Sequence, residues 1–292
     1  TMSCAEGEVG KVYEGKIDYE VESYEIDLNK KLPVNLMLNV GSPENAFSSS
    51  LLPNSGVGLA RLEFIINNYV EIHPLALLDY PNVREDVRIK IKEIIGEHDD
   101  GKWYFIKRLA RGMAKIASAF YPNNIIVRLS DFKSNEYKNL IGGELYEPDE
   151  ENPMLGWRGA SRYYSSEYKK GFELECLAIK YARENMKMDN IVVMIPFCRT
   201  PEECKNVIST MKEYGLERGV NNLQVYLMCE IPSNVIEADN FSQYIDGVSI
   251  GGNDLLQLTL GIDRDSEKIT NLSDHTNICL LYTSPSPRDW MV

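Results

Sequence analysis

The sequence predicts an α/β protein built on parallel strands, either a (β/α) barrel or a doubly wound sheet. Short apolar runs recur along the chain, and several are near-continuous, as in strands that are buried on both faces of a sheet. Longer stretches with the period of an amphipathic helix lie between them, and this alternation is typical of the class. The expected strands are Val34–Val40, Val57–Phe64, Asn124–Leu129, Ile191–Phe197, Gln224–Ile231 and Gly247–Ile250.

Four stretches carry helix signals. They are Tyr80–Gly96, Lys102–Tyr121, Ser166–Met186 and Thr200–Tyr214. The second places one apolar stripe along its length, made of Phe105, Leu109, Met113, Ile116 and Ala117. The fourth opens with Thr200 and Pro201 followed by two glutamates, a typical helix start.

The two ends of the chain depart from this rhythm. Thr1–Gly15 is expected to form a closing strand and turn that belong to something upstream. Cys279–Val292 shows the period of neither a helix nor a strand.

Composition excludes several classes of protein. The net charge of −13 and the pI near 4.8 argue against nucleic acid as a partner, because phosphate backbones need a basic surface. No apolar run approaches the roughly 20 residues of a membrane-spanning helix, and no secretory signal is visible.

The six cysteines form no C-x-x-C pair, which favours buried thiols of a cytoplasmic protein. The three histidines have no metal-ligand spacing, so structural or surface roles are expected for them.

Three arginines are candidates for binding an anion. Arg61 and Arg128 end apolar runs, and Arg158 lies in the segment NPMLGWRG. One buried arginine is usually a structural ion pair, here with Glu63 or Asp131. Three, each expected near the carboxyl end of a strand, favour an anion site, because barrel ligands collect at that face and the guanidinium fork suits phosphate and carboxylate.

Two carboxylates follow apolar runs in the same way. Glu230 comes after Tyr226–Cys229, and Asp254 follows Gly251, Gly252 and Asn253. Alone, Glu230 would be a capping or ion-paired residue and Asp254 the N-cap of a helix. Together, facing the arginines, they are interpreted as ligands of Mg²⁺, which prefers a few oxygen donors and keeps open positions.

Two further features are weaker. The Gly251-Gly252 pair would let the backbone approach a ligand closely, although glycine pairs also mark ordinary turns. Arg264 either reaches the same site or pairs with a neighbouring aspartate.

Seven ordered segments resemble the phosphoenolpyruvate synthase (pyruvate, water dikinase) branch of the phosphoenolpyruvate-utilising enzymes. They are GVGLARLEFIINN, IHPLALLDYPN, VRLSDFKSNEY, LIGGELYEPDEENPMLGWRGASRY, MIPFCRT, MCEIPSN and SIGGNDLLQLTLGIDRD. The similarity spans roughly 1–278. It implies a (β/α)8 barrel of the TIM type, truncated before its last strand and helix. Residues 1–20 would be the end of a phosphohistidine swivelling domain, and 21–278 the incomplete barrel that binds pyruvate and phosphoenolpyruvate.

The resemblance also implies a reaction. ATP phosphorylates a histidine on the swivelling domain of the same parent chain, and the barrel transfers that phosphoryl group to the enolate of pyruvate. Arg61, Arg128 and Arg158 would hold the carboxylate and phosphate, Glu230 and Asp254 would hold Mg²⁺, and the remaining substrate contacts would come from Gly251, Gly252, Asn253 and Arg264. Many relatives carry a small hydroxyl residue at the position of Gly252. A homodimer is one assembly that the parent could form.

Two catalytic groups of the family are expected to lie outside this sequence. They are the phosphorylated histidine and a cysteine after the last strand, which donates a proton to the enolate carbon. The fragment alone is therefore expected to be inactive, and its open barrel edge to make it prone to aggregation. Cys279 is not taken as that cysteine, because CLLYTSPSPRD matches one reading frame of a common sequencing adapter. Residues 279–292 are interpreted as an adapter-derived artefact rather than a native Ser/Pro tail. The source nucleotide read would decide this.

Other functions stay open from the residues alone. Pyruvate phosphate dikinase or another phosphoenolpyruvate-utilising phosphotransferase would use the same barrel. A Mg²⁺-dependent carbon–carbon lyase would use the same metal and enolate without a phosphohistidine. A non-catalytic binding module is the third alternative.

Overall fold

A computed structural model describes residues 1–3, 10–23, 33–96, 100–263, 266, 268–269 and 272–283. The chain divides into two units, Thr1–Val34 and Asn35–Val292. In the first unit, β1 (Met2–Ser3) pairs antiparallel with β2 (Lys11–Val12), and the Thr1 hydroxyl donates to the Gly15 carbonyl at 2.6 Å. This agrees with the strand and turn expected there.

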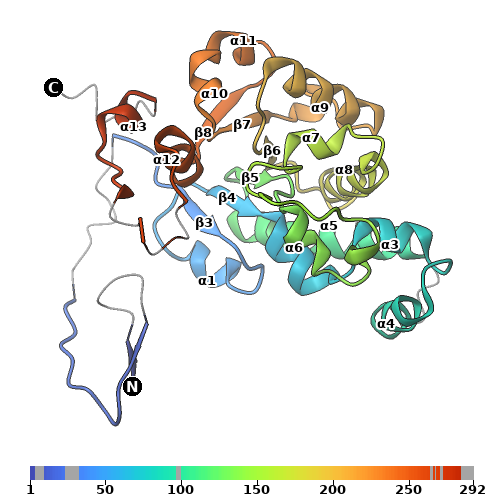
Figure 1. Ribbon diagram of the computed structural model, residues 1–292, viewed down its shortest axis with the longest axis horizontal. Helices are drawn as coiled ribbons and strands as arrows, with labels where there is room; N and C mark the ends of the chain where they lie inside the picture. Colours follow the sequence, from blue (N-terminus) through green and yellow to red (C-terminus); the bar gives the residue numbers. More distant parts are fainter. Residues whose placement is uncertain are drawn as a thin grey trace. The chain divides into compact units, whose positions relative to one another are not determined.

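The second unit is built on one curled sheet of six parallel strands (Figure 1). The strands are β3 (Leu38–Val40), β4 (Val57–Arg61), β5 (Ile125–Arg128), β6 (Ile191–Ile195), β7 (Val225–Cys229) and β8 (Gly247–Ile250). Their spatial order is the order along the chain, so each crossover joins neighbouring strands in the manner of a barrel rather than of a doubly wound sheet. The six predicted strands are confirmed, and the fold is an α/β half-barrel of the TIM type.

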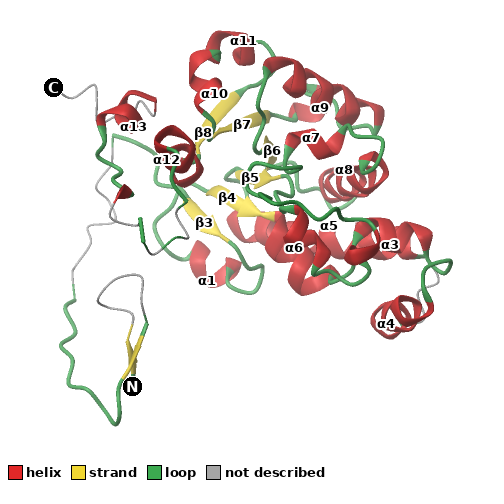
Figure 2. Ribbon diagram, in the orientation of Figure 1, coloured by secondary structure: helices red, strands yellow, loops and turns green. Residues whose placement is uncertain are grey.

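Helices separate successive strands and form an outer layer on one side of the sheet (Figure 2). They are α1 (Ala46–Ser50), α2 (Leu62–Ile65), the π-turn η1 (Ile66–Val70), α3 (Pro74–Asp79), α4 (Glu85–Ile95), α5 (Gly101–Phe120), α6 (Ser134–Lys138), η2 (Gly143–Leu145), α7 (Ala160–Tyr163), α8 (Lys169–Glu184), α9 (Pro201–Glu213), η3 (Val220–Asn222), α10 (Pro232–Ile236), α11 (Ala238–Ser242), α12 (Gly252–Leu260) and α13 (Ile278–Thr283). All five residues of the predicted α5 stripe are buried. Within the described residues, no helix has the length and apolar character needed to span a bilayer.

Alternate residues of each strand serve two different cores. On β5, Ile125 and Val127 pack with the helices in the main core, whereas Ile126 faces the inside of the curl with Val192 and Met194 of β6. Strand side chains point to opposite faces in turn, so both faces must be apolar here. This explains the near-continuous apolar runs in the sequence.

Two sequence predictions were wrong in detail. The predicted strand Val57–Phe64 ends at Arg61, and its last three residues begin α2, because Leu62 and Ile65 turn into the main core. The tail was expected to have no regular structure from Cys279 onward, yet α13 covers Ile278–Thr283 and buries Leu280 in a small apolar cluster with α12. Residues 284–292 lie outside the described part.

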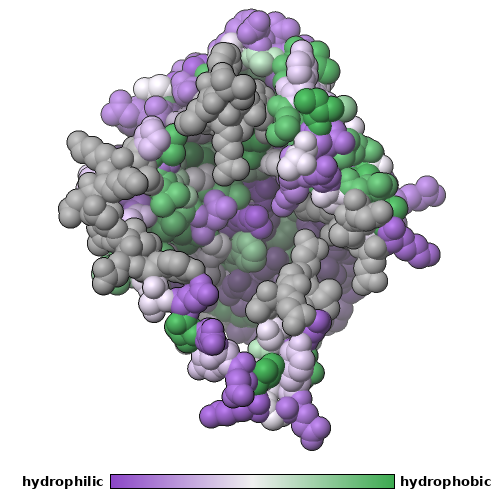
Figure 3. Space-filling model, turned by 90° about the vertical axis from the view of Figure 1, so that its left-hand side faces the viewer, coloured by the Kyte–Doolittle hydropathy of each residue, from purple (hydrophilic) through white to green (hydrophobic). Residues whose placement is uncertain are grey.

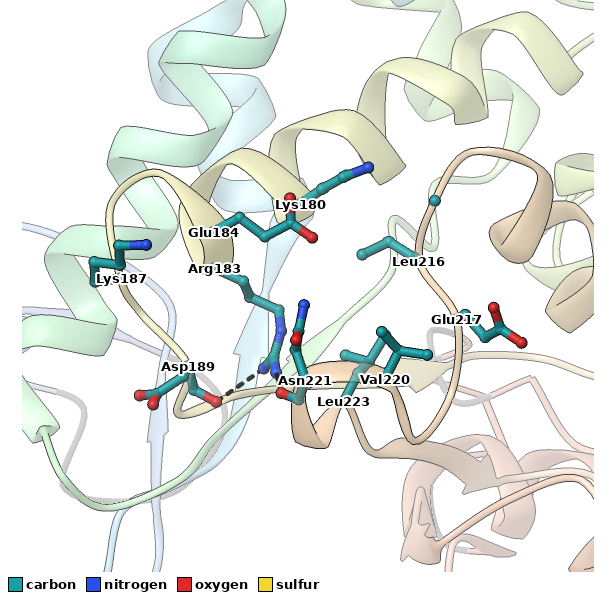
Figure 4. Close-up of a pocket in the computed structure, with 11 residues that line it drawn as sticks. Lys180, Arg183, Glu184, Lys187, Asp189, Leu216, Glu217, Val220, Asn221 and Leu223 are labelled. Atoms are coloured by element: carbon teal, nitrogen blue, oxygen red, sulfur yellow. Dashed lines mark hydrogen bonds between the residues drawn. The ribbon is translucent and has the colours of Figure 1, made fainter.

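Near the amino ends of the strands, Arg183 of α8 binds backbone carbonyls of neighbouring connections (Figure 4). Its guanidinium donates to the carbonyls of Asp189 at 2.9 Å, of Asn221 at 2.7 Å, and of Ile191. This arginine therefore ties two connections to the start of β6. At this end of a barrel such contacts serve stability, since ligands bind at the opposite face.

Candidate functional site

The carboxyl ends of the strands open into a cleft of about 760 Å³. Eight of the nine sequence-predicted residues line it, namely Arg61, Arg128, Arg158, Glu230, Gly251, Gly252, Asn253 and Asp254. Arg264, the ninth, lies outside the described residues. Figure 3, which turns the left-hand side of Figure 1 toward the viewer, shows a hollow in which both hydrophilic and hydrophobic residues are visible.

Arg128, the last residue of β5, is held by two acids. Its Nη2 lies 2.9 Å from Glu63 Oε1, and its Nη1 lies 3.3 Å from Asp131 Oδ2. The Asp131 amide also donates to Glu63 Oε1 at 2.5 Å, which closes a small ring of interactions. Burial would lower the pKa of Arg128, but these two carboxylates outweigh it and raise that pKa. The ion-pair partners considered from the sequence, Glu63 and Asp131, are both present.

Arg158 reaches the cleft from an unexpected direction. The prediction that it lies near the carboxyl end of a strand was wrong. Arg158 lies in the long connection between β5 and β6, just before α7. Its Nε and Nη2 donate to the two carboxylate oxygens of Asp131 at 3.0 and 2.6 Å, and its Nη1 lies 3.3 Å from Asp254. The guanidinium carbon is 4.0 Å from the centroid of the Phe197 ring. Asp131 therefore joins both buried arginines.

Arg61 occupies the rim. It is the last residue of β4 and exposed, with its guanidinium carbon 5.8 Å from the Phe64 ring centroid. Its position at a strand end agrees with the sequence prediction. Unlike Arg128 and Arg158, it is available to solvent.

Glu230 is the most deeply placed acid of the cleft. It follows β7 and is 0% exposed, and its Oε1 accepts a hydrogen bond from the Phe197 amide at 2.7 Å. Its Oε2 is buried without a hydrogen-bond partner. Burial, followed by the negative charges of Asp131 and Asp254, raises the pKa of Glu230 to about 8. The positive charges of Arg128 and Arg158 oppose this rise but do not outweigh it.

Helix α12 points its first turn at the cleft. Its N-cap is Gly251, so Asp254 is the third residue of the helix and not the N-cap that the sequence allowed. The strand β8 ends at Ile250, and the chain turns at Gly251 into the helix that begins at Gly252. Gly251 has no side chain that could cap the first-turn amides of this helix.

The two glycines at this helix start are not equivalent. A Cβ on Gly251 would lie 2.8 Å from both Cβ and Oε2 of Glu230, whereas a Cβ on Gly252 would meet nothing within 4 Å. We predict that Gly251→Ala lowers the free energy of unfolding by about 1–3 kcal/mol through overpacking. Gly252→Ser should change it by less than about 0.5 kcal/mol, because the added side chain has open space. Urea denaturation of both variants checks this, and equal losses would contradict it.

The pKa of Glu230 predicts a pH effect on stability. The unfolded carboxyl titrates near pH 4.5 and the folded one near pH 8, so the folded state holds its proton longer. This contribution is complete below pH 4.5 and is lost as pH rises to about 8, at no more than about 1.4 kcal/mol per pH unit. Glu230→Gln should flatten the stability profile between these limits without metal. A variant whose profile parallels the wild type would refute the assignment.

Below the cleft lies a buried cluster that holds the segment carrying Arg158. Arg162 of α7 pairs with Glu147, and Nε2 of His73 lies 3.0 Å from the same carboxylate. Because His73 Nδ1 accepts from the Leu75 amide, Nε2 carries the proton that is donated to Glu147. The rings of Tyr137, Trp157 and Tyr168 surround the Arg162 guanidinium at 4.0–4.7 Å. The structural role expected for His73 is confirmed.

Sequence reasoning missed other residues that shape the cleft. Phe197 contacts both Arg158 and Glu230, and only the position of its motif after a strand hinted at this. Met154 is uncharged, and its sulfur accepts from Arg158 Nη1 at 2.9 Å. Lys133 and Glu136 lie further out on the lining, where no pattern distinguished them from ordinary surface charges.

The fold and the cleft together define an α/β-barrel domain that presents buried arginines and carboxylates at its carboxyl face. The family described as "PEP-utilising enzyme, PEP-binding domain" matches residues 19–283, and the chain belongs to this family.

Curated relatives agree with this family. The chain is 50% identical to the phosphoenolpyruvate synthase of Aquifex aeolicus (95% of this chain, 38% of the relative) and 49% identical to that of Escherichia coli K12 (95% and 35%). It is also 50% identical to the phosphoenolpyruvate synthase of Helicobacter pylori (96% and 35%). The chain thus spans little more than a third of the length of these relatives.

Proposed function

We propose that this chain is the substrate-binding part of a phosphoenolpyruvate synthase, which converts ATP, pyruvate and water to AMP, phosphoenolpyruvate and phosphate. The observation that carries the proposal is the meeting of Arg128 and Arg158 with Glu230 and Asp254 in one cleft. The names and lengths of the relatives support the same reaction and further domains in the parent. In this proposal residues 1–20 end the phosphohistidine domain, residues 21–278 are the barrel, and 279–292 are foreign sequence.

The arginines supply the recognition of an anion. A planar guanidinium can donate two parallel hydrogen bonds to a carboxylate or phosphate. Arg128 and Arg158 line the cleft with donors that Asp131 engages, and Arg61 is exposed at its rim. In phosphoryl transfer the protein contributes mainly positioning and charge neutralisation. We infer that these three residues hold the carboxylate and phosphoryl groups, with the first turn of α12 as an additional donor.

The carboxylates fit Mg²⁺. Glu230 Oε2 is buried without a hydrogen-bond partner among the described residues, and burial, together with the negative charges of Asp131 and Asp254, raises the pKa of Glu230. No group of three or more His, Cys, Asp or Glu side chains with metal-site geometry occurs in the described part of the chain. Mg²⁺ commonly uses one or two carboxylates and completes its shell with water and substrate oxygens. When bound by Glu230 and Asp254, it would stabilise the negative oxygen of the enolate.

Cys279 does not belong to this machinery. It is an exposed residue of α13 and is not among the residues that line the cleft. We infer from the resemblance to the phosphoenolpyruvate-utilising enzymes that another cysteine of the parent donates the proton to the enolate carbon. The buried free thiols of Cys176, Cys198, Cys204 and Cys229 support a cytoplasmic location.

The experiment is a product analysis with the full-length protein, pyruvate, Mg²⁺ and ATP labelled at the β-phosphorus. Equal amounts of AMP and phosphoenolpyruvate, with the label recovered in phosphoenolpyruvate and no requirement for added phosphate, would support the synthase. Formation of pyrophosphate with a strict requirement for phosphate would assign the protein to the dikinases instead. Absence of both products, with cleavage of a 2-oxo acid, would point to a lyase and end the proposal.

A further inference from the structure

Phe197, two residues beyond β6, has an unusual backbone conformation. Its φ is +43°, although it is a bulky residue, and its side chain is only 2% exposed. The left-handed region is costly for such residues and persists only where the surroundings enforce it. Strained backbone of this kind is concentrated at functional sites.

Phe197 contacts both halves of the cleft at once. Its amide donates to Glu230 Oε1 at 2.7 Å, and its ring centroid lies 4.0 Å from the guanidinium carbon of Arg158. A second guanidinium, that of Arg199, lies 4.9 Å from the same ring. The main chain thus orients an acid while the side chain supports a cation.

The neighbouring loops keep Phe197 in this conformation. A Cβ on Gly159 would lie 2.7 Å from Phe197 Cβ and 2.8 Å from the Pro196 carbonyl oxygen, so the loop that carries Arg158 packs directly on this backbone. The Ala160 amide donates to that same carbonyl at 3.2 Å. Only glycine fits here, because Gly159 itself has a φ of +59°.

On the other side, Asn234 of α10 connects Phe197 to the loop after β7. Its Nδ2 donates to the Cys198 carbonyl at 2.6 Å, and its Oδ1 accepts from the amides of Glu230 at 3.2 Å and Ile231 at 3.0 Å. Asn234 is itself buried. The segment Phe197–Cys198 is therefore fixed between the arginine loop and the glutamate loop.

We propose that Phe197 is a positioning residue that sets the distance and orientation between Arg158 and Glu230. This inference rests on the proposed function, because it takes these two side chains as the anion and metal ligands. Phe197 touches neither reacting group. It acts by keeping the anion donor and the metal carboxylate in register, so that both can bind one ligand.

The test replaces Phe197 in the full-length protein in two ways. Phe197→Leu keeps an apolar side chain but removes the ring face, and 3,4,5-trifluorophenylalanine at position 197 keeps the shape but weakens the negative potential of the ring. Phe172 provides the matched control, since it is equally buried and stacks on Tyr163 at 4.3 Å outside the cleft. The measurements are the Kd of Mn²⁺ alone by electron paramagnetic resonance, the Kd of phosphoenolpyruvate by calorimetry, and the Tm.

For Phe197→Leu we expect the Kd of Mn²⁺ and that of phosphoenolpyruvate each to rise about 10-fold or more, as misplacement of a ligand group by a fraction of an ångström would cause. The trifluorinated side chain should raise the Kd of phosphoenolpyruvate about 3- to 10-fold with only a small fall in Tm, because the packing is kept and only the cation–π contact is weakened. The same changes at Phe172 should lower Tm and leave both Kd values within about 2-fold of the wild type.

The outcomes separate the two proposals. Wild-type protein that binds Mn²⁺ but not phosphoenolpyruvate would contradict the proposed function, while the Mn²⁺ affinities still test the positioning of Glu230. Equal Mn²⁺ affinity in Phe197→Leu, Phe172→Leu and wild type would overturn the positioning role. So would a trifluorinated variant that binds phosphoenolpyruvate as tightly as the wild type.

Discussion

Arg128→Ala is expected to weaken phosphoenolpyruvate binding by the full-length protein at least about 100-fold. The remaining affinity would be below the measurable range of most assays. The reason is the position of this guanidinium at the end of β5, where it is largely desolvated and braced by Glu63 and Asp131. Loss of a charge-assisted donor in such a place costs several times more than at the surface. Isothermal calorimetry with Mg²⁺ present measures the change.

Two further variants make this result specific. Arg128→Lys keeps the charge but loses the planar fork, so its affinity should fall between those of the wild type and the alanine variant. Arg88→Ala removes an exposed arginine of α4 that pairs with Glu85 in the same turn, and this variant should bind phosphoenolpyruvate normally. Unchanged affinity in Arg128→Ala, with its fold intact by circular dichroism, would remove Arg128 from the anion site.

Glu147→Ala is expected to have the largest effect on stability, a loss of about 3–5 kcal/mol. The substitution leaves Arg162 as a buried cation without its counter-ion, and it also removes the acceptor of His73. Burial would lower the pKa of the Arg162 guanidinium, whereas Glu147 raises it. Both partners are 0–1% exposed, so solvent cannot replace the lost carboxylate. Urea denaturation followed by tryptophan fluorescence reports the loss.

The same segment offers a matched control. Glu144 lies three residues earlier and pairs with Arg84 at 2.7 Å, but its side chain is 40% exposed. Glu144→Ala should cost less than about 1 kcal/mol, because exposed ion pairs contribute little. Comparable losses for the two glutamates would mean that the buried cluster does not hold the Arg158 segment in place.

Much of the fold follows from the sequence because strand signals here are strong. The runs around Val127 and Val193 are apolar on both faces, which only a buried parallel strand requires. Strand ends also predicted most of the cleft, since the carboxyl ends of parallel strands meet at one edge and bring Arg128, Glu230 and Asp254 together.

The remaining features depend on long-range packing and could not be predicted. Arg158 comes from a long connection, and only the cluster around Arg162 brings it back over the sheet. The left-handed conformation of Phe197 leaves no mark in the sequence, because phenylalanine ordinarily avoids it. Likewise, the apolar pattern predicts that Leu62 continues β4, whereas packing against the main core places it in α2.

The pairing of both inner arginines with Asp131 has a kinetic consequence. The donors of Arg128 and Arg158 are engaged with Asp131, and Glu230 and Asp254 line the same cleft. Under the proposed function, an anion must compete with Asp131 for these donors, whereas a divalent cation that binds first would draw the carboxylates toward itself. We therefore predict ordered binding, with the divalent cation before phosphoenolpyruvate, which calorimetric titration of each ligand with and without the other checks.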